Sequence, residues 1–206
     1  MNKNALLLLL VVSLSSIVVA QNKPSDRRAE FYVGFSELFT DHEQSGTPLD
    51  RFSGLLGVDV SGTGYITKRF GITGDFSAHF RSHDENVTGG PIHFKTSNYN
   101  YLVGPKFRFT NSTRVTPFLH ALAGVSNNRF SAKGNVAGNS SPILTPINIT
   151  DFAMALGGGL DIHIHKRISF RLFQIDYMPV FIRDRPITGF EGRRFDNVRF
   201  STGIVF

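Results

Sequence analysis

The sequence predicts an all-β fold, an eight-stranded antiparallel up-and-down barrel. Apolar and polar residues alternate over about eight segments, and the connections between these segments are alternately long and short. Beyond residue 20, no long segment keeps the period of 3.6 that is typical of a helix. Side chains alternate between the two faces of a strand, so each segment has one apolar and one polar face. The length of 206 residues fits one domain.

Residues 1–20 have the order of a secretory signal peptide. Lys3 supplies a positive charge, residues 5–12 are an unbroken apolar run, and small residues precede Gln21. We expect cleavage after Ala20; a retained N-terminal anchor is the alternative, but the run is shorter than the about 20 apolar residues of a spanning helix. No Cys follows this site, so a lipid-modified N-terminus and disulfides are both excluded. Residues 21–28 form a short polar tail, and the barrel domain spans residues 29–206.

The first half of the barrel contains four predicted strands, at residues 29–40, 52–67, 70–81 and 97–109. The third is the most regular, because Phe70, Ile72 and Phe76 alternate with polar residues throughout. Polar segments with Gly and Pro predict long loops at 41–51 and 82–96, and Lys68 and Arg69 predict a tight turn.

The second half contains strands at residues 115–126, 147–162 and 168–180, and a closing strand that begins at Gly192 or Phe195 and ends at Phe206. Short turns are expected at 110–114 and 163–167, and long loops at 127–146 and 181–191. Within 168–180 the apolar residues change face by one position. Such a shift indicates a β-bulge, which we expect near Leu172 and Phe173.

The strand and loop lengths favour a transmembrane barrel. Strands of roughly 10 to 13 residues match or slightly exceed the 9–11 that cross a bilayer at a tilt. Short turns on one rim and long loops on the other are typical of outer-membrane barrels, whose turns are periplasmic and whose loops are extracellular. The mean hydropathy of −0.06 agrees with strands that have two different faces. Aromatic residues near the strand ends would form interfacial girdles: Phe39, Phe70, Phe80, Tyr99, Phe109 and Phe206.

The charged and polar residues lie opposite the apolar face, which predicts a polar lumen. An Arg or Lys facing lipid at mid-depth costs about 2–4 kcal/mol, whereas lumenal charges can pair. We expect a lumenal polar network of Asp59, Asp75, His79, Lys106, Arg108, His120, Asp161, Arg171, Gln174, Asp176 and Arg199. Such a lumen is filled by side chains and is not an open pore.

Periodicity alone also allows the inverse arrangement, a soluble exported lipocalin-like barrel with an apolar, ligand-binding interior. Glycines decide in favour of the membrane, because they lie mostly on the charged face, where a narrow lumen needs room. These glycines are Gly34, Gly57, Gly71, Gly104, Gly157, Gly159 and Gly203.

The closing strand places Phe200, Ile204 and Phe206 on one face and ends on Phe206. This pattern resembles the C-terminal assembly signal of bacterial outer-membrane barrels. Together with residues 72–79, 116–124, 155–161 and 171–177, it makes residues 29–206 similar to the OmpA/OmpX-type family of small bacterial outer-membrane β-barrels.

The resemblance implies an outer-membrane location in a Gram-negative cell envelope. It also implies three kinds of partner: outer-membrane lipids, lipopolysaccharide and the barrel assembly machinery. The implied role is envelope integrity, adhesion or surface interaction through the loops. The formal charge of +6 needs no nucleic acid to explain it, and we expect a monomer.

A lipid-A-modifying barrel enzyme is the alternative function. It would use a Ser or His activated by a neighbouring base. The candidates are His79, His120, Ser77, Ser126, Asp75 and Asp161. They lie on the predicted lumenal face, whereas the resemblance places lipid-modifying groups toward the membrane or the outer rim. We therefore expect no catalysis and no cofactor.

Two further sets of residues carry weaker hypotheses. His163 and His165 share a strand face, as a metal site requires, but no third ligand is placed by sequence, so solvated histidines are expected instead. Arg183, Arg185, Arg193 and Arg194 flank the last loop. Guanidinium groups suit phosphate, so these four are candidate lipopolysaccharide contacts; ordinary solvated charge is the alternative.

Overall fold

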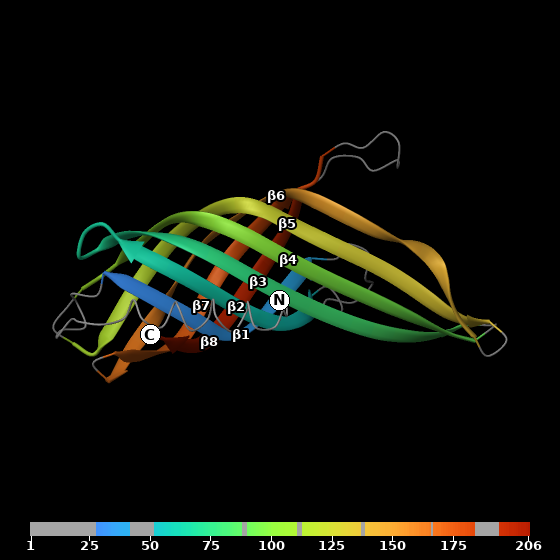
Figure 1. Ribbon diagram of the computed structural model, residues 1–206, viewed down its shortest axis with the longest axis horizontal. Coiled ribbons are helices and arrows are strands. Elements are labelled where there is room, and N and C mark those ends of the chain that lie inside the picture. The colour runs from blue at the N-terminus through green and yellow to red at the C-terminus, as the bar shows by residue number, and fades with distance from the viewer. Residues whose placement is uncertain are drawn as a thin grey trace, which may run out of the picture.

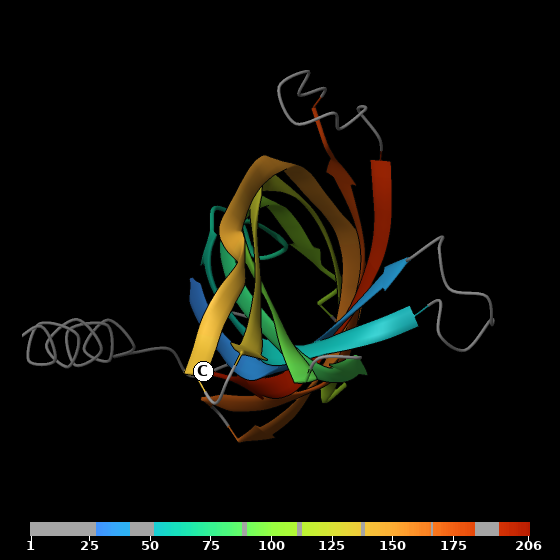
Figure 2. The same cartoon turned by 90° about the vertical axis from the view of Figure 1, so that its right-hand side faces the viewer.

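The computed structural model describes residues 28–41, 52–87, 90–110, 113–136, 139–165, 167–183 and 194–206. It shows a closed antiparallel barrel of eight strands in sequence order, which confirms the predicted fold (Figures 1 and 2). The predicted signal peptide, its cleavage site and residues 21–27 of the tail lie outside the described residues. The strands are β1 (Ala29–Asp41), β2 (Phe52–Tyr65), β3 (Phe70–Val87), β4 (Gly90–Arg108), β5 (Val115–Val136), β6 (Asn139–His165), β7 (Ile168–Phe181) and β8 (Arg194–Val205).

The barrel closes where β1 pairs with β8. Their register brings Phe35 opposite Thr202, and Phe31 and Phe206 exchange two backbone hydrogen bonds of 3.1 and 2.8 Å. Every strand therefore has two partners, so the sheet has no open edge. Lipid cannot form hydrogen bonds with backbone N–H and C=O groups, and the closed sheet supplies these groups with partners on neighbouring strands.

The faces of the strands follow the predicted alternation. Arg171 and Arg199 are among the largest fully buried side chains, whereas Phe35 is 50% and Tyr101 53% exposed. The charged residues thus face the lumen and the large apolar residues face outward. The soluble lipocalin-like alternative, with an apolar interior and a polar exterior, is therefore wrong.

Outward aromatic residues pair across strands. Phe76 lies opposite Tyr101 with ring centroids 5.1 Å apart, and the Phe80 and Tyr99 rings are 5.8 Å apart in an edge-to-face arrangement. Such pairs contribute about 0.5–1.5 kcal/mol beyond the area that they bury. Phe80 and Tyr99 are the last outward aromatic residues of β3 and β4 toward the hairpins. In the part of the chain that the structure describes, no helix is long and apolar enough to cross a membrane.

Two long hairpins replace two of the predicted loops. The segments 82–96 and 127–146 were expected to be irregular, but β3 pairs with β4 up to Val87 and Gly90, and β5 pairs with β6 up to Val136 and Asn139. The reason is that backbone groups form the ladder, so pairing continues beyond the membrane even where both faces are polar. The hairpins lie at the right of Figure 1, and the C-terminus lies at the opposite end.

The predicted β-bulge is confirmed in β7. Arg171 pairs with Gly203 and Gln174 with Ser201, so three steps along β7 match two along β8. In a regular strand, residues three apart point to opposite faces. The bulge instead directs both Arg171 and Gln174 into the lumen, where each is 1% exposed.

Candidate functional site

A central cluster of charged residues crosses the lumen from β8 to β3 and β7. The Arg199 guanidinium donates to Asp176 Oδ2 through Nε (2.9 Å) and Nη2 (2.7 Å), and its Nη1 donates to Asp75 Oδ1 at 2.8 Å. Asp59 Oδ2 lies 3.8 Å from the same Nη1 and accepts the Ser201 hydroxyl at 3.0 Å. Asp176 lies opposite Arg199 on the neighbouring strand, whereas the contacts to Asp75 and Asp59 connect β8 to strands that are not its neighbours in the sheet.

The Asp176 carboxylate is the most heavily used acceptor of the central cluster. His120 Nε2 lies 2.6 Å from its Oδ1, and Gln174 Nε2 donates to its Oδ2 at 2.7 Å. Gly157 lies opposite Asp176 on β6, and a Cβ atom there would collide with Oδ1. Glycine at this position therefore leaves the space that the carboxylate occupies.

Arg171 connects the central cluster to the turn end of the barrel. Its Nη1 donates to Gln174 Oε1 at 2.6 Å, and its Nε donates to Asp161 Oδ1 at 2.8 Å. Its guanidinium lies 4.1 Å from the ring centroid of Tyr32 and 4.3 Å from that of Phe118. Cation–π contacts of this kind are strengthened where water is excluded.

A basal cluster forms around Glu30. This carboxylate accepts Arg108 Nη1 at 2.8 Å, Lys106 Nζ at 3.1 Å and the Tyr65 hydroxyl at 2.7 Å. Arg108 also lies over the Tyr65 ring, 3.7 Å from its centroid. Glu30 is not a member of the network predicted from the sequence, although Glu30 shares a strand face with Tyr32, two residues further on. That spacing was the available signal.

The remaining predicted network residue, His79, lies closer to the hairpin end. His79 Nε2 is 2.9 Å from the Ser36 hydroxyl, and Ser36 lies 3.0 Å from the Ser201 hydroxyl. Asn98 and Asn100 extend this polar layer with an amide hydrogen bond of 2.6 Å. The structure thus places every residue of the predicted network on the inner wall.

The lumen also contains an apolar cluster that the sequence did not predict. Its members are Leu38, Leu55, Leu102, Leu122, Ala153, Ala155, Met178 and Val180. Each is at most 5% exposed. They occupy inward positions on the same face as the charged residues, so period-two alternation alone assigns them no separate role. Buried apolar side chains at these positions need no polar partners.

The candidate catalytic residues do not form a nucleophile–base arrangement with one another. Ser77 Oγ accepts from Asn100 at 3.1 Å and Ser126 Oγ accepts from Asn98 at 3.0 Å, so both hydroxyls are hydrogen-bonded to amides and not to a base. His120 contacts Asp176. All six candidates are buried in the lumen.

The two histidines at the end of β6 lie in the strand and not in the predicted turn. His163 Nδ1 is 2.6 Å from Ser169 Oγ, and its Nε2 is 2.9 Å from Thr116 Oγ1; His165 is exposed. Among the described residues, no group of three or more His, Asp and Glu side chains could hold a metal ion.

The candidate lipopolysaccharide contacts are only partly described. Arg194 is exposed, and its Nε is 2.9 Å from Asp196 Oδ1. Arg183 is also exposed, whereas Arg185 and Arg193 lie outside the described residues. The residues of the candidate assembly signal face outward, with Phe200 37%, Ile204 42% and Phe206 39% exposed.

Solved structures with the same architecture are outer-membrane barrels. The chain is similar to Ail, the attachment invasion locus protein of Yersinia pestis, with 16% sequence identity and a TM-score of 0.51 over 86% of this chain and 97% of that one. It is similar to OprG from Pseudomonas aeruginosa at 11% identity and a TM-score of 0.51, over 86% of this chain and 93% of that one. At such identities the likeness shows the fold alone. No curated protein matches the chain.

Similarity at the level of the sequence family is more extensive. The family described as the outer membrane protein beta-barrel domain matches residues 5–206. That match covers nearly the whole chain and includes all eight strands. The chain belongs to the outer membrane protein β-barrel family and is an integral protein of the outer membrane.

Proposed function

We propose that this barrel is non-enzymatic, that its own side chains close its lumen, and that it acts through its outer hairpins in surface interaction of an adhesion-like or envelope-structural kind. The observation that carries the proposal is the unequal length of the strands. β5 and β6 have 22 and 27 residues, whereas β1 and β8 have 13 and 12. The 13 residues of β6 before Phe152 extend over about 40 Å at about 3.3 Å per residue. This surface stands outside the lipid and is open to partners.

Side-chain packing in the lumen supports the closed state. The basal, central and apolar clusters follow one another from the turn end to the hairpin end, and Arg199, Asp59 and Asp176 are each 0% exposed. An eight-stranded barrel has an interior just wide enough for side chains. A conducting path would require these ion pairs to separate within the lumen.

The positions of the candidate catalytic groups support a role without catalysis. A lipid-A-modifying enzyme must bring its nucleophile to a lipid that stands beside the barrel. Here His79 and Ser126 are 0% exposed and His120 is 8% exposed, all on the inner wall. A nucleophile at any of these positions is separated from the lipid by the sheet.

A first test uses the ligand class known for a similar structure. Ail has been solved in complex with the heparin analogue sucrose octasulfate; that structure is 16% identical, with a TM-score of 0.52. We expect phosphatidylcholine liposomes that carry this barrel to bind immobilised heparin. A variant in which Asn-Gly replaces residues 82–95 and 129–148, the outer parts of the two hairpins, loses the cations Lys95, Arg129 and Lys133 and should bind this polyanion at least ten-fold less.

Two results would contradict the proposal. Equal heparin binding by the full-length and shortened barrels would exclude the hairpins as the interacting surface. Stepwise conductance of the full-length barrel in a planar bilayer would contradict a closed lumen. Before these comparisons, an SDS gel should show that each barrel is folded. A folded barrel migrates differently when its sample has been boiled and when it has not.

We also propose that Arg183, Arg185, Arg193 and Arg194 contact lipopolysaccharide phosphates around β7 and β8. Guanidinium geometry supports this, although Arg194 already has a carboxylate partner in Asp196. Replacing all four with Gln should lower the amount of lipopolysaccharide that remains on the purified barrel. Unchanged retention would show that these arginines are ordinary solvated charge.

Export and assembly are the last part of the proposal. Residues 1–20 would direct export, and the assembly machinery would recognise Phe200, Ile204 and Phe206 on β8, after which the barrel remains a monomer. Phe206→Ala should lower the folded fraction several-fold in cells and leave refolding in micelles unchanged. Phe170→Ala is the matched control, because Phe170 is 36% exposed on the neighbouring strand and Phe206 is 39% exposed. Equal loss in both variants would show a general effect of lipid-facing aromatics.

A further inference from the structure

The outward face of β4 and β5 changes from apolar to basic at one level of the barrel. Tyr99 lies opposite Asn127, and the next outward pair toward the hairpin end is Ser97 with Arg129. The following outward pairs are Lys95 with Ser131 and His93 with Lys133. Below this level, the outward residues are Val103, Tyr101, Ala123 and Val125. The apolar outward surface of both strands therefore ends at the same cross-strand pair, Tyr99 with Asn127.

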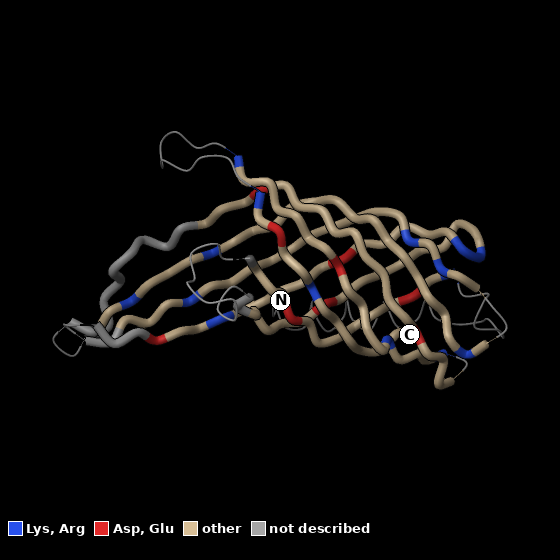
Figure 3. Tube along the Cα trace, turned by 180° about the vertical axis from the view of Figure 1, so that it is seen from behind, with Lys and Arg blue, Asp and Glu red and all other residues tan. Residues whose placement is uncertain are grey.

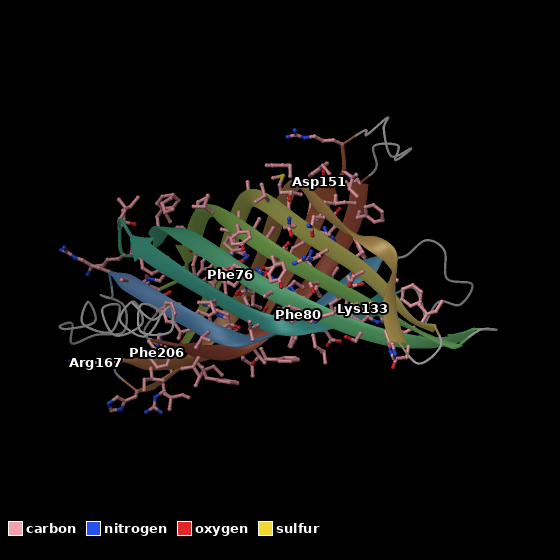
Figure 4. The ribbon with its side chains drawn as sticks, turned by 45° about the vertical axis from the view of Figure 1, so that its right-hand side comes forward. Phe76, Phe80, Lys133, Asp151, Arg167 and Phe206 are labelled. Carbon is pink, nitrogen blue, oxygen red and sulfur yellow. The ribbon has the colours of Figure 1, made fainter. Side chains whose placement is uncertain are left out.

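Three exposed cations form what we call the basic wall: Lys95, Arg129 and Lys133. Lys95 is diagonal to both Arg129 and Lys133 in the β4–β5 register. Diagonal neighbours on one face of a sheet are about 7–8 Å apart, within joint reach of one anionic group. Figure 3 shows basic positions along the extended hairpins, and Figure 4 shows Phe76, Phe80 and Lys133 in succession toward that end.

Within the described ranges, none of the three cations of the basic wall forms an ion pair with a carboxylate. Asp84, the acid on the same outward face, is held by His93, whose Nδ1 lies 2.6 Å from Asp84 Oδ1. By contrast, Arg194 on the opposite side of the barrel has its own carboxylate partner. Like charges at such spacing repel one another unless an anion is shared between them.

The basic wall begins at the level of the lipid headgroups and extends above it. Two residues along a strand span about 7 Å, or roughly 5 Å of height at the tilt usual for such barrels. Arg129, Lys95 and Lys133 then lie about 5, 10 and 15 Å above Tyr99. The polar layer on each side of a phospholipid bilayer is only about 5–8 Å thick. A partner that reaches all three cations therefore carries phosphates above the ordinary headgroup level.

We propose that the basic wall binds the phosphates of lipopolysaccharide in the outer leaflet. The inference rests on the outer-membrane location and adds a second contact, distinct from the arginines of β7 and β8. Lipid is favoured over a soluble polysaccharide because the three cations continue the lipid-facing side of the same two strands. A lipid that stands against Tyr101 and Val125 would present its headgroup to Arg129 and Lys95.

The test compares two triple variants of the full mature chain in detergent micelles. The wall variant is Lys95→Gln, Arg129→Gln and Lys133→Gln. The matched control is Arg69→Gln, Arg114→Gln and Arg167→Gln, which removes the same charge from exposed positions at the turn end. We expect the wall variant to bind lipopolysaccharide about ten-fold more weakly than the unmodified barrel, and the control to bind it normally. Dephosphorylated lipopolysaccharide should bind the unmodified barrel as weakly as native lipopolysaccharide binds the wall variant.

Each alternative outcome overturns the assignment. Equal affinity of the wall variant and the unmodified barrel would exclude the wall as a site. Equal loss in both variants would show an effect of net charge alone. Loss of heparin binding with normal lipopolysaccharide binding would assign the wall to surface interaction instead. Because the heparin measurement is independent, failure of the lipid site leaves the role of the hairpins intact. Heat-modifiability of both variants establishes that the comparison is between folded barrels.

Discussion

The structure depends on the pairing of buried charges across a narrow lumen. Arg199 on β8 joins Asp75 on β3 and Asp176 on β7, and all three side chains are at most 6% exposed. Ions removed from water are costly unless their partners are close and well oriented. Because lipid surrounds the outside, the lumen is the place in this barrel where these charges can lie.

Two local features of the backbone make the pairing possible. The bulge at Leu172 and Phe173 directs both Arg171 and Gln174 inward, so that Gln174 bridges Arg171 and Asp176. Gly157 leaves the room that the Asp176 carboxylate fills. With the lumen closed as we propose, the outer hairpins and the basic wall are the surfaces that can meet other molecules.

Alternation in the sequence was sufficient to predict the strands, their inner and outer faces and the bulge. Phe70, Ile72 and Phe76 indicate an outward face because a strand repeats every two residues. The sequence did not reveal the partners of Arg171, since Tyr32 and Phe118 reach it only through the curvature of the closed barrel. It also mistook the hairpins for loops, because backbone pairing leaves little trace in side chains outside lipid. The sequence also did not reveal that Glu30 binds Tyr65, Lys106 and Arg108, because closure of the barrel brings these residues together.

The most direct test of the charge network is the free energy of unfolding in lipid vesicles, measured by urea titration. Arg199→Met leaves two buried carboxylates without their cation and should cost about 3–5 kcal/mol. Adding Asp75→Asn and Asp176→Asn to it should restore part of that loss, because the two carboxylates that accept hydrogen bonds from Arg199 are then replaced by neutral amides. Arg194→Met, which breaks an exposed pair, should cost less than about 1 kcal/mol. Arg199→Met with the stability of the Arg194 variant, or a triple variant less stable than Arg199→Met, would contradict the account.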